Sequence, residues 1–299
     1  KKKGAYEKYL IAKINDGEEY EILFPPQKTP NVTARFQVIV RLKQGRNVIK
    51  LFNPVTSNAD SEMYQYIRMG KALQKATAKV AKERKQKEKP IVFSICEWGW
   101  GKPYNWGAKA GNLWRTTPDI RPWWWWIKLI YEHTVKLYKY ASKGHYNDPD
   151  MLEVGNGKLS YNQNVSHFSL WCMMNAPLIL GNDLRNMSDQ VKSIVTNRNM
   201  IAINQDSLAK QAKRVRKGAV DVLAKPLADG SVAVCFFNKT SHAKSCKFDL
   251  NTLANDEYVA MQKKSEYSLK EQWSGQIATT DGNVNAVLEK HQTKVFIVK

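Results

Sequence analysis

The sequence predicts an α/β fold, in which half of a β/α barrel is preceded by the end of a β-sandwich and followed by an antiparallel β domain. Three observations support this prediction. Residues 1–58 show the two-residue period of strands, residues 59–208 alternate short apolar segments with helical ones, and residues 209–299 return to a period of two. A strand, a polar loop and a helix, repeated about four times, make half of a β/α barrel.

Residues 1–58 are expected to form strands with one buried face. Apolar and polar residues alternate over residues 34–42, a Lys-Gln-Gly-Arg turn follows at 43–46, and residues 47–52 continue the pattern. This arrangement predicts a hairpin. Because few possible partner strands precede it, the segment is interpreted as the end of a β-sandwich.

Residues 59–208 change to a helical period. A first helix is predicted to begin at Asp60 or Ser61, either of which can cap it, and to end before Pro90. Residues 91–96 are apolar enough for a strand buried on both faces, as in a parallel sheet. The later predicted elements are strands at 113–116 and 177–181 and helices at about 122–140, about 162–174 and from Ser188 to about Thr196.

Residues 209–299 predict an antiparallel β domain. Turns of the Asp-Gly and Asn-Gly type separate its apolar segments. The predicted strands are 220–223, 232–237, 267–273, 284–288 and 295–298.

Composition favours a folded chain with a large core, since 43% of the 299 residues are hydrophobic and 25% are charged. No apolar run approaches the roughly 18 residues that span a bilayer, so no membrane span is expected. Lys1–Lys3 are not followed by the apolar segment of a signal peptide. Extracellular and cytoplasmic locations both remain open.

The net charge of +20 comes largely from lysines and arginines in residues 1–89. Such a charge can attract nucleic acid, anionic polysaccharide or an anionic membrane. It can equally coat the solvated face of a helix. We favour the solvated face, and expect no nucleic-acid partner, because no aromatic residues are interleaved with the lysines of residues 79–89.

The cysteines and histidines do not predict a metal site. Cys96, Cys172, Cys235 and Cys246 have neither metal-ligand spacing nor the density of a disulfide framework. Cys235 and Cys246 could pair across neighbouring strands or remain free thiols. The five histidines are scattered, so neither a metal nor another cofactor is expected.

Polar residues follow several predicted strands, at the ends where β/α barrels carry their reactive groups. Glycoside hydrolysis needs two carboxyl groups, one to donate a proton and one to attack or to activate water. Asp119 is the candidate proton donor, because the nearby Arg115 and other carboxylates can adjust how readily it releases a proton. Asp119 could instead cap the helix that follows, and Asp148 could be only a turn former.

A carboxylate beside an arginine at a strand end, with Trp and Met close by, favours a carbohydrate-active enzyme, and five motifs in order strengthen this interpretation. They are Ser-Ile-Cys-Glu-Trp-Gly at 94–99, Trp-Arg-Thr-Thr-Pro-Asp-Ile at 114–120, Asn-Asp-Pro-Asp-Met-Leu-Glu-Val-Gly-Asn at 147–156, Ala-Pro-Leu-Ile-Leu-Gly-Asn-Asp at 176–183 and Ile-Ala-Ile-Asn-Gln-Asp at 201–206. Together they closely resemble glycoside hydrolase family 27, the α-galactosidases and α-N-acetylgalactosaminidases. The resemblance covers roughly residues 60–215, and the C-terminal β domain fits the family in type and position.

The resemblance implies a retaining α-galactosidase that removes terminal α-linked galactose from oligosaccharides or glycoconjugates. Asp119 matches the general acid/base, Arg115 the residue that binds the sugar near its 2-hydroxyl, and Asp150 a carboxylate that braces the pocket. Glu97 matches a glutamate of the galactose-specific members, where the N-acetyl-specific members carry a small residue. The residues that match positions lining the galactose pocket are Cys96, Trp98 and Met151.

The nucleophile of the family is an aspartate in a Tyr-Asp-x-Cys-like motif, and no such motif precedes residue 60. We therefore interpret the chain as the C-terminal part of a bacterial-type member. Residues 1–58 would be the tail of an inserted carbohydrate-binding-like β-sandwich, and the nucleophile would lie upstream of Lys1. Cys96 would then lack its usual disulfide partner. We expect no substantial α-galactosidase activity from this chain alone, and a catalytically inactive galactoside-binding protein is the alternative.

The run Trp123–Trp126 follows Asp119 closely. We interpret these residues as core and helix-packing side chains. One of them could still lie at the edge of the sugar cleft.

Overall fold

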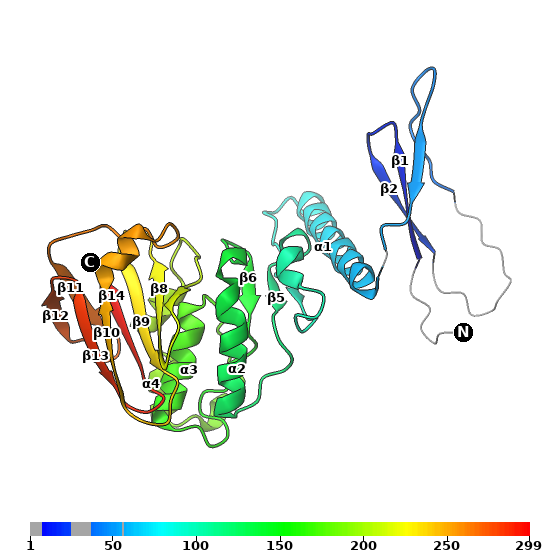
Figure 1. Cartoon of the computed structure of the whole chain (residues 1–299). Helices are drawn as coiled ribbons and strands as arrows, with labels where there is room; N and C mark the ends of the chain where they lie inside the picture. The colour runs from blue at the N-terminus through cyan, green and yellow to red at the C-terminus, as the bar shows by residue number, and fades with distance from the viewer. Residues whose placement is uncertain (1–7, 25–36, 56) are drawn as a thin grey trace. The chain divides into compact units, whose positions relative to one another are not determined.

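The computed structural model describes residues 8–24, 37–55 and 57–299 (Figure 1). The chain divides into two compact units, residues 1–89 and residues 90–299. The predicted domain boundaries at 58 and 208 stay predictions.

The first unit contains a three-stranded antiparallel sheet. Its strands are β1 (Lys8–Ile14), β2 (Glu19–Phe24) and β3 (Ile49–Phe52), in the order β2-β1-β3. Ile11, Ala12 and Ile14 of β1 are buried. The Asn15 side chain accepts a hydrogen bond from the Val48 backbone N–H at 2.7 Å, which ties the β1–β2 turn to the segment entering β3.

The predicted hairpin is wrong in its first strand. Residues 37–42 form no strand, residues 34–36 lie outside the described residues, and β3 pairs with β1 instead. The turn itself is present, because Asn47 Nδ2 donates to the carbonyls of Lys43 and Gly45, both at 2.9 Å. The alternating pattern predicts strands but does not identify their partners. The partner of β3 is β1, which lies more than 30 residues earlier.

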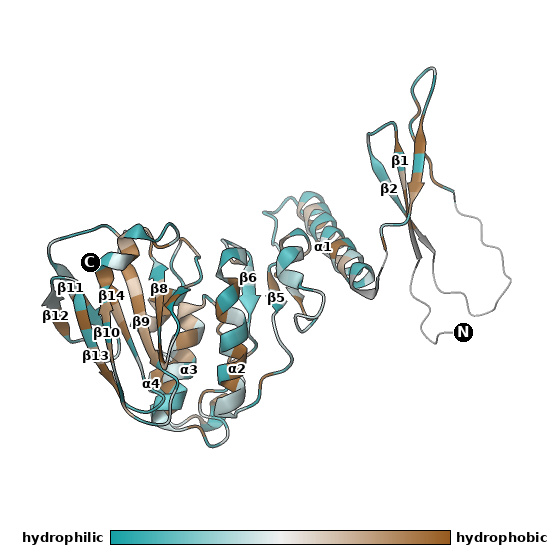
Figure 2. Cartoon of the chain, viewed as in Figure 1, coloured by the Kyte–Doolittle hydropathy of each residue, from teal (hydrophilic) through white to brown (hydrophobic). Residues whose placement is uncertain are grey.

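Helix α1 (Asn58–Glu83) completes the first unit. It ends before Pro90 as predicted, but its cap is Ser57, whose hydroxyl accepts from the Asp60 N–H at 3.2 Å. Figure 2 shows α1 as mostly hydrophilic, in contrast to β9 and α3. Beyond Gly70 nearly all of its side chains are half-buried or exposed.

The second unit begins with a small parallel sheet. Strands β4 (Ser94–Ile95), β5 (Leu113–Arg115) and β6 (Tyr146–Asp148) lie in that order, with Ile95 opposite Trp114 and Arg115 opposite Asp148. Parallel strands in register place their carboxyl ends at one edge, which we call the carboxyl edge.

Two predicted buried strands are shorter than expected. Only Ser94 and Ile95 of residues 91–96 form a strand, and Ile91 and Val92 are exposed. Residues 177–181 contribute a single parallel bridge, between Leu152 and Leu180. Ile95 is fully buried, and among the described residues β4 is the edge strand of this sheet, with β5 as its neighbour.

Helices follow the strands, as predicted. The α-helices are α2 (Trp124–Thr134), α3 (Tyr161–Met173), α4 (Asp189–Val195) and α5 (Arg198–Asn204). The short 3-10 helices are η1 (Pro103–Asn105), η2 (Gly107–Lys109), η3 (Val135–Tyr140) and η4 (Leu184–Asn186). A capping box between Ser160 and Gln163 begins α3, and Ser188 caps α4 as predicted.

The C-terminal region is an antiparallel β-sandwich. One sheet has the order β12-β11-β14-β9-β8-β7, and the other pairs β10 with β13. The elements are β7 (Lys213–Arg216), β8 (Val220–Pro226), β9 (Val232–Asn238), β10 (Lys244–Asp249), η5 (Leu250–Asn255), β11 (Tyr267–Glu271), β12 (Ile277–Thr280), β13 (Asn283–Leu288) and β14 (Thr293–Val298). All five predicted strands are present. Cys235 and Cys246 lie in different sheets and are free thiols.

The six-stranded sheet is apolar on both faces. One face packs on the second sheet, and the other packs on α2 and α3, which lie between it and the parallel strands (Figure 1). A buried ionic network crosses the same boundary. Asp221 accepts from Tyr131 of α2 at 2.9 Å and pairs with Arg214 at 3.0 Å and Lys239 at 2.9 Å. The helical layer and one face of the six-stranded sheet therefore share one core, and the other face of that sheet forms a second core inside the β-sandwich.

His167 makes this core sensitive to acid. It is fully buried in α3, and its Nε2 accepts the Glu153 N–H at 2.9 Å. Burial lowers its pKa from 6.5 to about 3. Between these values the unfolded chain binds a proton that the folded chain does not, so stability falls as the pH falls through this window, by up to about 1.4 kcal/mol per pH unit.

We predict that His167→Gln flattens the pH dependence of unfolding between pH 6.5 and about 4, because glutamine can accept the same N–H without titrating. Urea denaturation followed by tryptophan fluorescence measures this, since all ten Trp lie in residues 90–299. His242→Gln, at an exposed histidine, is the control for the substitution itself. Equal pH slopes in His167→Gln and the parent chain would contradict the prediction.

Candidate active site

The loop after β4 rests on the end of β5. Trp98 and Gly99 have positive φ angles of 53° and 80°. A Cβ at Gly99 would lie 2.2 Å from the Thr116 carbonyl oxygen, so only glycine allows this approach. Glu97 packs back against Gly101, where an added Cβ would lie 2.1 Å from Glu97 Oε1. The predicted residues Glu97 and Trp98 are thereby held at the carboxyl edge.

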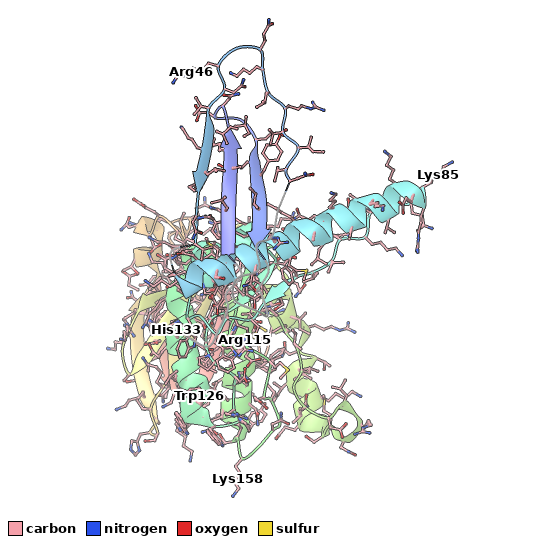
Figure 3. The ribbon with its side chains drawn as sticks, turned by 90° about the vertical axis from the view of Figure 1, so that its right-hand side faces the viewer. Arg46, Lys85, Arg115, Trp126, His133 and Lys158 are labelled. Carbon is pink, nitrogen blue, oxygen red and sulfur yellow. The ribbon has the colours of Figure 1, made fainter. Side chains whose placement is uncertain are left out.

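Arg115, the last residue of β5, connects the carboxyl groups of this edge. It is 8% exposed and lies among the interior side chains, whereas Lys158 extends into solvent (Figure 3). Its Nη2 lies 2.6 Å from Asp150 Oδ2 and 3.2 Å from Asp119 Oδ1. Its Nε has no hydrogen-bond partner among the described residues. One guanidinium therefore positions two of the predicted site residues.

Asp150 is fully engaged by its surroundings. Its Oδ2 accepts from the Ile120 N–H and its Oδ1 from the Met151 N–H, both at 2.8 Å, in addition to the Arg115 contact. Its backbone adopts φ 82°, an uncommon value for a non-glycine residue, and its carbonyl accepts from Trp171 Nε1 at 2.8 Å. A buried carboxylate with all these donors braces the edge and has little capacity left for a ligand.

Asp119 is the available carboxylate. Its side chain is 55% exposed, against 8% for Asp150, and the Arg115 contact holds one of its oxygens. Its backbone carbonyl accepts from Trp126 Nε1 at 2.8 Å. The alternative that Asp119 caps the following helix is wrong, because the cap of α2 is Trp123. Asp119 is thus fixed at its backbone and open at its carboxyl group.

Asp148 behaves as a turn former. Its Oδ1 accepts the Asp150 N–H at 2.8 Å, which closes a turn at the end of β6. Burial raises its pKa, while the Asp150 N–H and then Arg115 oppose this effect.

The remaining predicted residues are at the surface. Met151 is 41% and Trp98 42% exposed, and Cys96 is exposed without a disulfide. Met151 is linked to the Arg115 cluster through Asp150.

Two residues that the sequence did not identify as individual site residues, Asn147 and Trp126, support the edge. Asn147 is buried and accepts from Trp114 Nε1 at 2.8 Å, while its Nδ2 donates to the Leu137 carbonyl and to Gln211 Oε1, both at 2.9 Å. Trp126 donates a hydrogen bond from Nε1 to the Asp119 carbonyl. The alternation of β6 could have revealed Asn147, since it faces away from Asp148 into the interior.

The tryptophan run divides by role. Trp124 packs inward, with Nε1 2.7 Å from His291 Nδ1 and its ring edge against Phe237. The interpretation as core therefore holds for Trp124. It is wrong for Trp123 and Trp125, which are 52% and 57% exposed.

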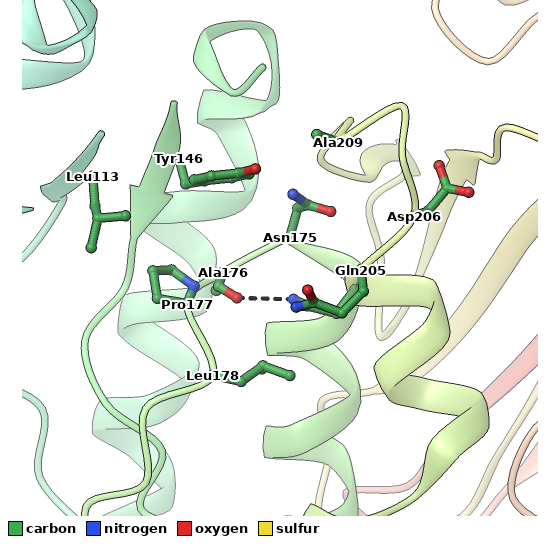
Figure 4. A pocket seen from close by; sticks show the side chains of 10 residues that line it. Leu113, Tyr146, Asn175, Ala176, Pro177, Leu178, Gln205, Asp206 and Ala209 are labelled. Atoms are coloured by element: carbon green, nitrogen blue, oxygen red, sulfur yellow. Dashed lines mark hydrogen bonds between the residues drawn. The ribbon is translucent and has the colours of Figure 1, made fainter. Parts of the chain in front are cut away.

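A cavity of about 230 Å³ lies at the opposite end of the strands. It is lined by the first residues of β5 and β6, Leu113 and Tyr146, and by Asn175, Gln205 and Asp206 (Figure 4). Leu113 begins the strand that Arg115 ends, so this cavity is separate from the Asp119 cluster. In β/α folds the chemistry lies at the carboxyl edge, and we assign the candidate site there.

Within the described residues, no three His, Cys, Asp or Glu side chains are grouped as a metal site would need. None of the helices in that part of the chain is both long and apolar enough to cross a bilayer.

The family model for alpha galactosidase A matches residues 44–206, and that for the alpha galactosidase C-terminal beta sandwich domain matches residues 217–298. The chain belongs to the α-galactosidases of glycoside hydrolase family 27. The alpha-galactosidase A of Cellvibrio japonicus is 38% identical over 224 residues, which are 70% of this chain and 55% of that protein. The alpha-galactosidase of Cyamopsis tetragonoloba is 35% identical over 212 residues, 70% of this chain and 50% of that protein.

Solved structures support the same fold. Alpha-galactosidase I of Mortierella vinacea matches with a TM-score of 0.72 at 24% identity, covering 81% of this chain and 64% of that one. The predicted fold class is confirmed. The chain spans about half the length of the curated relatives it matches.

We predict that Asp150→Asn destabilises residues 90–299 by about 3 kcal/mol, because it leaves the buried Arg115 cation without its main partner. The matched control is Asp183→Asn, which breaks the exposed pair with Arg185 and is expected to change stability by less than about 1 kcal/mol. Urea unfolding monitored by tryptophan fluorescence compares the two. Equal losses of unfolding free energy in the two variants would contradict the prediction that the buried Arg115–Asp150 pair contributes more to stability than an exposed pair.

Proposed function

We propose that this chain carries the acid/base part of a retaining α-galactosidase active site. The observation behind the proposal is the single Arg115 guanidinium that contacts both the buried Asp150 and the exposed Asp119. Asp119 would donate its proton to the glycosidic oxygen as the bond to galactose breaks. As a carboxylate it would then remove a proton from the water that releases the sugar.

The exposure of Asp119 suits this role. A general acid must reach the leaving oxygen, and a half-exposed carboxyl group on a fixed backbone can do so. Arg115 keeps one oxygen of the carboxyl group in place and leaves the other for substrate. Its buried position and unpartnered Nε also suit it to hold a sugar hydroxyl at the same edge.

The retaining mechanism needs a second carboxylate about 5–5.5 Å from the first. Asp150 is close, but both its oxygens already accept backbone hydrogen bonds. Asp148 is buried within its turn. We propose that the nucleophile comes from outside the described residues, as the resemblance to the family implies.

The proposed substrate is a terminal α-linked galactose. The curated relatives are alpha-galactosidases. The resemblance to the family matches Glu97 to a glutamate that the galactose-specific members tend to carry. Its position beside Gly101 keeps a bulky acidic side chain next to the edge that carries Asp119.

This assignment predicts rescue by an added nucleophile. With phenyl α-galactoside alone, the purified chain should show no substantial turnover. With azide, the anion attacks C1 from the β face, the C1–oxygen bond breaks, and phenol leaves with a proton from Asp119. The expected product is β-galactosyl azide, identified by NMR and mass spectrometry.

Asp119→Asn should abolish this product, while Asp183→Asn, at an exposed carboxylate outside the cluster, should not change it. Hydrolysis without azide would refute the claim that the nucleophile lies elsewhere. Galactose binding without any azide product would refute the acid role of Asp119 and favour a galactoside-binding protein.

A further inference from the structure

Trp123 and Trp125 form an exposed aromatic surface that the proposed reaction does not use. Their rings are nearly parallel, with centroids 5.8 Å apart and an interplanar angle of 17°. Trp125 also meets the edge of Trp126, at 5.2 Å and 69°. Large apolar rings left in water at adjacent positions are unusual on a folded surface and often mark a binding site.

This surface is joined to the candidate acid. Trp126 contacts Trp125 on one side and donates to the Asp119 carbonyl on the other, at 2.8 Å. Trp123 is the cap of α2, the helix that follows β5, so it lies at the carboxyl edge with Asp119. The exposed rings are therefore connected to Asp119 through Trp126.

The surface is also held in place. A Cβ at Gly157 would lie 2.9 Å from Pro122 Cβ, so the loop after β6 packs closely on the residue before Trp123. Trp124, which lies between Trp123 and Trp125 in the sequence, donates a hydrogen bond to His291. Preformed, rigid aromatic groups bind with a small loss of conformational entropy.

We infer that Trp123 and Trp125 are a stacking platform for a sugar ring other than the cleaved galactose. This inference rests on the proposed function and names its substrate class: a neutral oligosaccharide or polysaccharide that carries galactose as its terminal unit. The C–H face of a pyranose ring packs on an indole, while the hydroxyls at its rim remain in water, as a half-exposed tryptophan allows.

The test uses the full chain and two kinds of probe. Neutral trisaccharides without galactose (mannotriose, cellotriose and maltotriose) measure binding to the platform. Methyl α-galactoside measures binding to the galactose site. Binding is followed by the indole N–H signals in NMR, assigned with Trp123→Phe and Trp125→Phe. At least one trisaccharide should shift the Trp123 and Trp125 signals.

Trp125→Ala should weaken that binding about tenfold and leave the affinity for methyl α-galactoside unchanged. Leu129→Ala, one turn further along α2 and also exposed, is the matched control and should bind as the parent chain does.

Three results would overturn the inference. They are no trisaccharide shifting these signals, equal trisaccharide affinity in Trp125→Ala and the parent chain, and a dimer in solution that Trp125→Ala converts to a monomer. The last would make the rings an interface between copies. Failure of the proposed function would appear instead as no binding of methyl α-galactoside, and the trisaccharides would still report on the platform.

Discussion

The contact between Arg115 and Asp150 determines the geometry of the carboxyl edge. A guanidinium that is almost fully buried needs an anion beside it, and Asp150 supplies one at 2.6 Å. Asp150 in turn accepts the Ile120 N–H, which fixes the residue after Asp119. The loop after β5 and the turn after β6 are thus joined through one charge pair, and the exposed carboxyl group of Asp119 is a consequence of where that pair holds the chain.

The layers behind the edge make this arrangement rigid. Asn147 connects β5, β6 and Gln211, and α3 contributes Trp171 to the Asp150 carbonyl. The six-stranded sheet closes the core from the other side, with Asp221 joined to Tyr131 across the boundary. This buried hydrogen bond fixes α2 against the β-sandwich. The β-sandwich therefore stabilises the layer behind the site, although it contributes no residue to the Asp119 cluster.

The sequence predicted four of the five α-helices, five sandwich strands and the Arg115–Asp119 cluster, because each depends on a local period or a compact motif. The sequence predictions were wrong where the structure of a segment depends on which distant segment it pairs or packs with. Residues 37–42 have a strand pattern but no ladder, and β3 pairs with the distant β1. The four tryptophans look alike in sequence, and only the packing of α2 on His291 and Phe237 shows that Trp124 is core while its neighbours face solvent. The hydrogen bonds from backbone N–H groups to Asp150 could not be predicted from the sequence either, because the sequence does not show the positive φ angle at that residue.

A crystal structure of the chain with bound galactose tests the central claim most directly. The account predicts the sugar at the carboxyl edge, with its anomeric oxygen within hydrogen-bond distance of Asp119 and its 2-hydroxyl near Arg115. Galactose bound instead in the cavity between Leu113 and Asp206, with the Asp119 edge empty, would contradict the assignment of this edge as the active site.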